Sequence, residues 1–343
     1  MTSKKILYIG PNIKGSTTDK RISALMELKY KLNIIDTCQF YQLRTSILNA
    51  IQIRIGKGPI YKNILSSALY EINKFKTKYL IIENGYLFNK NSLVKIKKNY
   101  PELKIIYLTV DSIKTKTYQK SFFLQTLCLY DYVITTKNND IDIYKEYQTQ
   151  KIIFSYQGID EMNLGDYNLS TEEQFLKSEV VFIGNYGKER ARSLKFLIKN
   201  NIPLKIFGFN WNKNKFFRSL NIKPVMDDKY YKVLNNSKIA LCFLNQQVGD
   251  TYTTRSFEIP ASGTLLLAED TEDHKNLFKE NKEAIFFSND NDLLKKINYY
   301  LINHKERKEI AKCGKDRIKK YNFTWKSNLE KIFIEIASHT KKV

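Results

Sequence analysis

Short apolar runs alternate with amphipathic stretches along most of this chain. Runs without internal alternation are typical of strands covered on both faces, and helical patterns fall between them, for instance at 21–28 and 91–100. This alternation predicts an α/β protein built from two doubly wound parallel sheets. The predicted strands are 6–10, 32–36, 79–83, 105–110, 132–136 and 151–155 in the first half, and 180–184, 204–208, 239–244, 264–268 and 284–287 in the second.

A polar stretch at 160–178 lacks a strand pattern and predicts the boundary between two domains, 1–170 and 171–322. Two such domains facing one another would make a cleft. The last segment, 323–343, has an apolar stripe at helical spacing. This helix can pack on its own domain or cross back to the first, and we predict that it crosses back. The stripe consists of Trp325, Leu329, Ile332, Phe333 and Ile336.

Charge and composition narrow the class of protein. The net charge is +22, but the excess of Lys and Arg is shared by both halves, whereas a polyphosphate groove concentrates it on one element. Nucleic-acid binding is therefore disfavoured. Two basic concentrations, at 90–98 and 305–320, suit either anionic lipid headgroups or simple solvation.

Nothing in the sequence indicates a signal peptide, a membrane span or a zinc motif, so we expect a reduced, cytoplasmic protein, with contact at the inner face of the membrane as an option. Asp290 and Asp292 match a DxD metal pattern, yet they stand where Asx residues cap a helix. Asp227 and Asp228 have the same interpretation. We predict no metal site.

The most informative stretch is 250–269, which runs from a polar loop into a buried strand. Asp250, Arg255 and Glu258 supply an acid, a cation and a second acid, and Ser262 and Gly263 supply a tight turn. This combination suits a polyhydroxylated anion such as a nucleotide sugar. The alternative is a helix with ordinary surface charges.

A second group of candidates follows the strands at 180–184 and 204–208. Gly184 and Asn185 form a turn ahead of a helix, where backbone N–H groups can meet a phosphate, and Lys188 and Arg190 can add charge-assisted contacts. Gly208 ends the next strand. We therefore predict contacts with a phosphate-bearing ligand at this edge of the second sheet.

Three residues of the first half are candidates for substrate contacts. Gly15 and Ser16 follow the first strand, and Asp111 follows the strand at 105–110. Each stands at the carboxyl end of a predicted parallel strand, where substrate loops lie.

The segments FIGNYGKERARSL, IPLKIFGFNW, YYKVLNNSKIALCFL, TTRSFEIPASGTLLLAED and NYYLINHKERKEIAKCGKDRI together resemble the CgeB-like glycosyltransferases of the group-1, GT-B class. The resemblance implies a GT-B fold of two Rossmann-like domains and a donor site marked by two acids with seven residues between them. Glu258 matches the second acid, and Asp250 replaces the usual Glu. Preorganised cations must meet the negative charge of the departing diphosphate, and Arg190 and Arg255 are the candidates. Thr254 is placed with the donor-binding residues. On the same resemblance the acceptor-side residues are Gly15, Ser16 and Asp111.

The function implied is transfer of a sugar from a UDP-, GDP- or dTDP-linked donor to a glycan, lipid-linked or protein acceptor, with retention and without metal or other cofactor. We expect the pathway to be synthesis of a surface or spore-type glycan. Two alternatives are a nucleotide-sugar epimerase of the same fold and a non-catalytic glycan- or surface-binding module.

Overall fold

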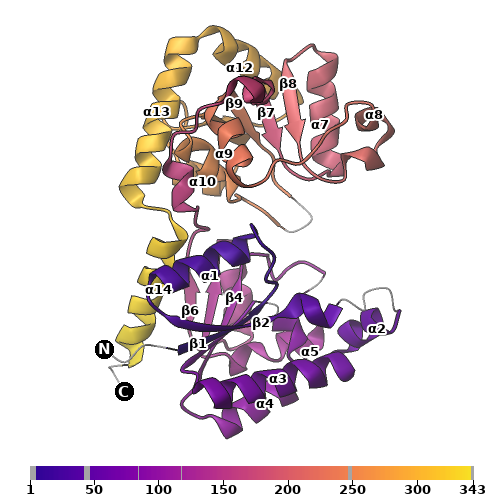
Figure 1. The fold of residues 1–343 in the computed structure, drawn as a ribbon, viewed down its shortest axis with the longest axis vertical. Helices are drawn as coiled ribbons and strands as arrows, with labels where there is room; N and C mark the ends of the chain where they lie inside the picture. Colours follow the sequence, from indigo (N-terminus) through magenta and orange to yellow (C-terminus); the bar gives the residue numbers. More distant parts are fainter. Residues whose placement is uncertain (1–4, 42–46, 84, 117, 246–248, 341–343) are drawn as a thin grey trace. The chain divides into compact units, whose positions relative to one another are not determined.

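The computed structural model describes residues 5–41, 47–83, 85–116, 118–245 and 249–340. The chain divides into two compact units. Unit 1 contains 1–157, 247–249 and 325–343, and unit 2 contains 158–246 and 250–324. Each unit is built on one parallel sheet with helices on both faces (Figure 1). None of the described helices is long and apolar enough to cross a bilayer.

Unit 1 holds a six-stranded sheet of order β2-β1-β3-β4-β5-β6, so the chain winds outward in both directions from β1. Its strands are β1 (Lys5–Gly10), β2 (Lys31–Asp36), β3 (Tyr79–Ile82), β4 (Lys104–Thr109), β5 (Tyr132–Thr135) and β6 (Ile152–Phe154). Its α-helices are α1 (Thr17–Glu27), α2 (Ile47–Ile55), α3 (Pro59–Phe75), α4 (Lys90–Asn99), α5 (Ser121–Leu124), α6 (Ile141–Glu146) and α14 (Trp325–Thr340).

Both faces of this sheet are buried, which explains the unbroken apolar runs of its strands. Leu7 and Ile9 of β1 join the core beneath α3 and α4, whereas Ile6 and Tyr8 join the core beneath α1 and α14 (Figure 1). Alternate residues of a strand point to opposite faces, so each core takes every second side chain.

The C-terminal helix α14 packs on unit 1, as predicted. All five residues of its apolar stripe are buried in the core shared with α1. The ring of Phe333 packs edge-on against Tyr79, with 5.4 Å between centroids. Asn328 also donates a hydrogen bond from Nδ2 to the backbone oxygen of Tyr156 at 3.0 Å.

Unit 2 holds a five-stranded sheet of order β11-β10-β9-β7-β8, and the predicted doubly wound class is confirmed for both units. Its strands are β7 (Ser178–Ile183), β8 (Leu204–Phe207), β9 (Ser237–Cys242), β10 (Leu265–Glu269) and β11 (Ile285–Phe287). Its α-helices are α7 (Lys188–Lys199), α8 (Lys215–Arg218), α9 (Asp227–Asn235), α10 (Arg255–Ala261), α11 (Glu272–Leu277), α12 (Asp290–Ile302) and α13 (His304–Tyr321).

The acidic pairs in unit 2 differ in their helix-capping roles. Asn289 caps α12, and Asp292 of its first turn accepts from Ser288 N at 3.0 Å, so the DxD pattern serves the helix start as predicted. The prediction for Asp227 and Asp228 was wrong in detail. Both lie inside the first turn of α9, and the N-cap position makes no side-chain hydrogen bond.

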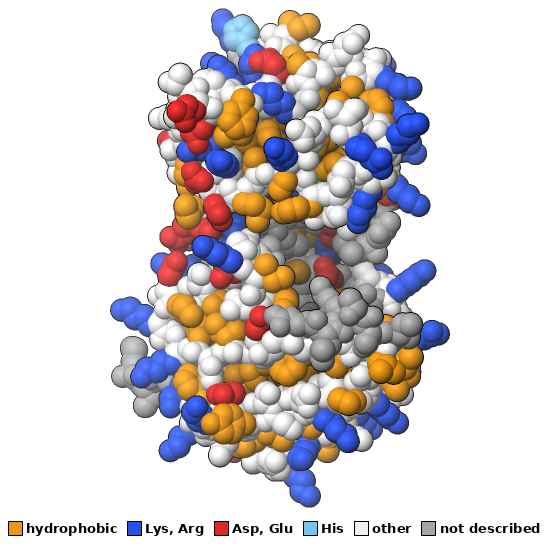
Figure 2. All heavy atoms as spheres, turned by 45° about the vertical axis from the view of Figure 1, so that its right-hand side comes forward, with side chains coloured by type: hydrophobic (Ala, Val, Ile, Leu, Met, Phe, Trp, Pro, Cys, Tyr) orange, Lys and Arg blue, Asp and Glu red, His pale blue; other side chains and the backbone are white. Residues whose placement is uncertain are grey.

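Surface charge agrees with the spread of basic residues along the sequence. On the face shown in Figure 2, Lys and Arg side chains are scattered over both units and form no single track. This even spread keeps the molecule cationic overall without marking one element as a polyanion groove.

A buried ion pair ties together the parts of unit 1. Arg21 of α1 and Glu83 after β3 are 2% and 7% exposed, and Arg21 Nη2 donates to Glu83 Oε1. Glu83 also accepts from Tyr8 at 2.6 Å and from Thr18 at 2.8 Å, and the Arg21 guanidinium lies 4.9 Å from the Trp325 ring. Burial by itself lowers the pKa of Arg21, but Glu83 and Tyr8 reverse the shift. The cluster thus links β1, β3, α1 and α14.

We predict that Glu83→Gln lowers the free energy of unfolding by about 3–5 kcal/mol, because Arg21 is left as an uncompensated buried charge. Urea denaturation followed by circular dichroism measures the change. Asp142→Asn is the control, since Asp142 pairs with Lys145 on the surface and its loss should cost less than about 1 kcal/mol. A similar, small effect for both variants would contradict the assignment.

Candidate functional site

The sheet of unit 2 changes direction at β7, which lies between β8 and β9. Doubly wound sheets bind ligands at the carboxyl ends of the strands beside such a switch point. Here that edge is formed by the turn at 184–187 after β7, residues 243–245 and 249–254 after β9, and the end of β10.

Two glycine turns meet at this edge. A Cβ on Gly208, whose φ is +150°, would lie 1.9 Å from the Gly184 carbonyl oxygen. That carbonyl accepts from Trp211 Nε1 at 2.9 Å, and Asn185 Oδ1 accepts from Phe209 N at 3.3 Å. Gly208 therefore serves close packing of the two turns. Trp211 is 1% exposed and belongs to the core of unit 2.

Arg190 on α7 reaches from the β7 turn to the β9 loop. Its Nη1 donates to Asn185 O and its Nη2 to Leu244 O, both at 3.4 Å. Burial, and then the nearby charge of Arg255, lower the pKa of Arg190, while Asp250 and Glu269 oppose the shift. Arg190 is thus half-buried within electrostatic reach of a second guanidinium and two carboxylates.

Arg255 is the first residue of α10 and is also half-buried. Its Nε is enclosed and makes no hydrogen bond within the part of the chain that the structure describes. Buried donors are normally satisfied, so an unpaired guanidinium N–H beside another cation is an unusual arrangement. The guanidinium of Arg255 therefore combines positive charge with an unused N–H donor, which suits an anion.

Glu258 lies one helical turn after Arg255 and is 6% exposed. Its Oε2 accepts a hydrogen bond from the hydroxyl of Tyr230 on α9. Burial, and then Glu258, raise the pKa of Tyr230, whereas Arg255 lowers it. The structure therefore brings Glu258 and Arg255 together around Tyr230. The sequence analysis did not identify Tyr230, since nothing in the pattern of α9 distinguishes it from a core tyrosine.

Asp250 and Thr254 form the loop that leads into α10. Asp250 Oδ2 accepts from Asn245 N at 3.3 Å, and Asp250 N donates to Asn245 O at 3.2 Å. Thr254 O accepts from Glu258 N at 3.0 Å and so begins the helix. Asp250 thus closes the base of its loop within electrostatic reach of Arg190.

Glu269, at the end of β10, is a site residue that the sequence analysis missed. Its Oε1 accepts from Leu244 N at 3.0 Å. Burial raises the pKa of Glu269, and the Leu244 N–H and Arg190 hold it down. The sequence did contain a signal for Glu269, because an acidic residue at the end of an apolar strand lies where the carboxyl ends of parallel strands meet. No three His, Cys, Asp or Glu residues are grouped as metal ligands among the described ranges.

Two predicted donor residues, Ser262 and Gly263, lie apart from this cluster, whereas a third, Lys188, lies beside it at the start of α7. Ser262 and Gly263 end α10 and precede β10, so they lie at the amino edge of the sheet, roughly 16 Å from Glu269 along the strand. Ser262 Oγ donates to Ile259 O at 2.7 Å, and Gly263, with φ +79°, makes the turn. Lys188 is exposed at the start of α7.

The acceptor-side candidates belong to unit 1, at the carboxyl ends of its strands. Gly15 has φ +76°, and its N–H donates to Asp19 Oδ2 at 2.8 Å. Ser16 caps α1 by accepting from Asp19 N at 3.2 Å. Asp111 follows β4, where its carbonyl accepts from Thr109 Oγ1 at 2.9 Å. Gly15 and Ser16 therefore shape the turn into α1.

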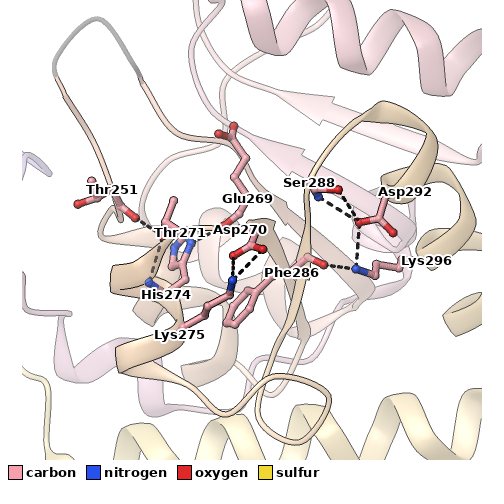
Figure 3. A network of polar contacts seen from close by, with 10 residues as sticks. All are labelled: Thr251, Glu269, Asp270, Thr271, His274, Lys275, Phe286, Ser288, Asp292 and Lys296. Atoms are coloured by element: carbon pink, nitrogen blue, oxygen red, sulfur yellow. Dashed lines mark hydrogen bonds and ion pairs between the residues drawn. The ribbon is translucent and has the colours of Figure 1, made fainter.

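His274 connects the strand that carries Glu269 with the helix that carries Arg255 and Glu258. The ring is fully buried, with Nδ1 2.7 Å from Glu269 O and Nε2 2.8 Å from Ser256 Oγ on α10. A carbonyl only accepts, so Nδ1 carries the proton and Nε2 accepts from the Ser256 hydroxyl. Figure 3 shows the ring beside Phe286 while the Glu269 carboxylate points away from it. His274 thereby joins the end of β10 to the start of α10.

We predict that unit 2 loses stability as the pH falls below about 6.5. Burial lowers the pKa of His274 in the folded chain, so the unfolded chain binds a proton at a higher pH than the folded chain does. The stability that the neutral ring confers is therefore present above about pH 6.5 and is lost as the pH falls. His274→Gln should flatten the pH dependence between about 6.5 and 5 in urea denaturation. His304→Gln, at an exposed position, should leave it unchanged. Parallel curves for wild type and His274→Gln would refute the prediction.

Similarity to solved structures extends over nearly the whole chain. Sucrose-phosphate synthase (tll1590) from Thermosynechococcus elongatus superposes with a TM-score of 0.73 at 11% identity, covering 99% of this chain and 100% of that one. Anabaena Alr3699/HepE in complex with UDP and glucose gives 0.67 at 12%, covering 98% and 100%. UDP-GlcNAc 2-epimerase from Neisseria meningitidis bound to UDP-GlcNAc gives 0.57 at 14%, covering 97% and 98%. At these identities the likeness shows the fold, which is GT-B.

No curated protein matches the chain by sequence at a significant level. Residues 189–333 match the family model described as "Glycosyl transferase-like". This range contains the charged residues of the candidate site, namely Arg190, Asp250, Arg255, Glu258 and Glu269. Residues 189–333 are thus a glycosyl transferase-like domain in a chain of the GT-B fold, and the prediction of a glycosyltransferase is confirmed at that level.

Proposed function

We propose that the protein transfers a sugar from a nucleoside diphosphate to an acceptor hydroxyl, with the donor bound at the carboxyl edge of the unit 2 sheet. One observation carries the proposal: Arg190 and Arg255 are half-buried within electrostatic reach of each other, and Arg255 Nε is unpaired among the described residues. A diphosphate between them would satisfy both guanidinium groups with charge-assisted hydrogen bonds.

The same two residues suit the chemical step. As the glycosidic bond to the phosphate breaks, negative charge grows on the leaving diphosphate. Cations that are already in position stabilise that charge without reorganisation, and they do so more effectively in a partly desolvated site. Arg190 and Arg255 would supply this charge directly, which is why we propose a metal-independent reaction.

Glu258 is assigned to the nucleoside. A carboxylate accepts hydrogen bonds from both ribose hydroxyls, and a bond to a charged group contributes about 1.5–3 kcal/mol. The hydrogen bond from Tyr230 orients this carboxylate one turn from Arg255. Asp250, at the other end of the motif, is assigned to the transferred sugar.

We further propose retention of configuration, with the leaving phosphate taking the proton of the acceptor hydroxyl as the new glycosidic bond forms. No separate base is then needed. The spacing of Asp250 and Glu258, and the resemblance to CgeB-like enzymes, support this assignment. We place the reaction in the cytoplasm, with a glycan, lipid-linked saccharide or protein as acceptor.

The comparisons favour uridine as the base. Alr3699/HepE was solved with UDP and glucose, and the N. meningitidis epimerase with UDP-GlcNAc. The second of these also supports an alternative function, epimerisation of a nucleotide sugar without an acceptor. Incubating UDP-sugars with the protein alone separates the two, because an epimerase yields an isomerised sugar nucleotide and a transferase does not.

The proposed function is tested first by thermal unfolding with UDP, GDP and dTDP. A ligand at about 100 times its Kd stabilises the folded state by about 2.7 kcal/mol, so the cognate nucleotide should raise Tm measurably. Sugar transfer from the matching donor to a panel of acceptors then tests the reaction. If none of these nucleotides binds, the non-catalytic alternative takes precedence.

We predict that Glu258→Gln raises the KM for the donor and lowers kcat, reducing kcat/KM on the order of 10- to 100-fold, because the charged acceptor for the ribose hydroxyls is lost. Steady-state kinetics with varied donor measure the change. Glu272→Gln, an exposed acid on α11, is the matched control. Unchanged donor kinetics in Glu258→Gln would remove the central assignment.

We predict that Arg190→Ala and Arg255→Ala weaken UDP binding by about tenfold or more but change uridine binding little, since these residues are assigned to the diphosphate. Calorimetry with both ligands measures the difference. Arg192→Ala is the control on the same helix, because that side chain is 78% exposed. Equal losses for UDP and uridine would contradict the division of roles.

A further inference from the structure

Helix α2 of unit 1 is firmly attached along one side. Gln52 Oε1 accepts from Ile60 N at 3.0 Å, and Lys120 Nζ donates to Ile53 O at 3.2 Å. After the helix, Gly56 O accepts from Asn89 Nδ2 at 2.8 Å. Ile53 packs against the main core of the unit. The orientation of α2 on its unit is therefore set by contacts to three other segments.

The opposite side of α2 is an exposed apolar row. Leu48, Ile51 and Ile55 are 68%, 47% and 53% exposed. Their spacing of three and four residues places them on one face of the helix. Water is a poor solvent for such a row, and contiguous apolar surface on a soluble protein usually marks an interaction site. Figure 1 shows α2 at the periphery of unit 1.

Charge around α2 identifies the kind of partner. Residues 37–70 contain no Asp or Glu, while the chain as a whole has 35. Arg54, Lys57 and Lys62 in this stretch are exposed. A second copy of the chain would oppose the same cations across a two-fold contact, and a segment without Asp or Glu offers them no counter-charge. A partner that accepts both apolar side chains and cations is an anionic lipid surface.

We propose that α2 is an interfacial helix that docks unit 1 on an anionic membrane, with Leu48, Ile51 and Ile55 at the level of the acyl chains and Arg54 and Lys57 at the headgroups. Short amphipathic helices bind membranes by apolar burial together with attraction to anionic lipid. The two basic segments noted in the sequence are less suited, because α4 exposes Val94 and α13 exposes Tyr321 without a comparable row.

The test is sedimentation of the full chain with vesicles of phosphatidylcholine containing phosphatidylglycerol, and with vesicles of phosphatidylcholine alone. We expect binding to the first at low ionic strength and little to the second. The triple substitution Leu48→Ser, Ile51→Ser and Ile55→Ser should reduce binding at least tenfold while keeping every charge. Arg54→Gln with Lys57→Gln should reduce it about fivefold for each charge removed.

The matched control is Ile302→Ser with Ile334→Ser, which removes exposed isoleucines from α12 and α14 and should bind as wild type. Circular dichroism and Tm confirm folding of each variant. Ile51→Trp adds a direct readout, since its emission should shift to the blue only with anionic vesicles, and Trp211 and Trp325 are buried.

The proposal is overturned if the triple variant binds vesicles as wild type does, because charge alone would then account for binding. It is also overturned if wild type fails to sediment with anionic vesicles at low salt. A wild-type dimer that the triple variant abolishes in analytical ultracentrifugation would assign this face to a second copy of the chain instead. None of these outcomes depends on whether a nucleotide sugar binds to unit 2.

Discussion

The constraint that shapes the proposed site in unit 2 is that Arg190 and Arg255 lie within electrostatic reach of each other. Two guanidinium groups with reduced hydration repel each other, so their positions must be enforced by the surrounding structure. Leu244 and Asn185 accept from Arg190, while the carboxylates of Asp250 and Glu269 compensate its charge. Arg255 retains an unsatisfied Nε within the described part of the chain. The parallel sheet makes this possible, because three strand ends meet at one edge.

Unit 1 also buries a guanidinium, in a different setting. Arg21 is paired with Glu83, which is in turn hydrogen-bonded by Tyr8 and Thr18, and Trp325 lies over the guanidinium. One nitrogen of each arginine, Arg21 Nη1 and Arg255 Nε, lacks a hydrogen bond among the described residues. The two sites differ in location: Arg21 is 2% exposed and joins four elements of a core, whereas Arg190 and Arg255 are half-buried at an edge where strand ends meet. That location supports a structural role for the first cluster and a ligand-binding role for the second.

The charged cluster is held by a second layer of contacts. His274 bonds the end of β10 through Glu269 O and the start of α10 through Ser256, so the strand that carries Glu269 and the helix that carries Arg255 and Glu258 share one support. A buried neutral imidazole suits this role because each ring nitrogen has a single defined partner. The positions of Glu269 and α10 therefore depend on the packing of α11, which carries His274.

Much of the fold was predictable from the sequence, because apolar runs and the 3.6-residue stripe of α14 report burial of each element directly. The acid, cation and acid of 250–258 could also be found, since they lie close together in the chain. Tyr230, Glu269 and His274 could not be assigned, and Gly263 was grouped with residues at the opposite edge of the sheet. Those relations depend on which strand ends adjoin and in which direction α10 runs. Tertiary structure alone decides them, because hydrophobic periodicity specifies which face of an element is buried but not which elements become neighbours.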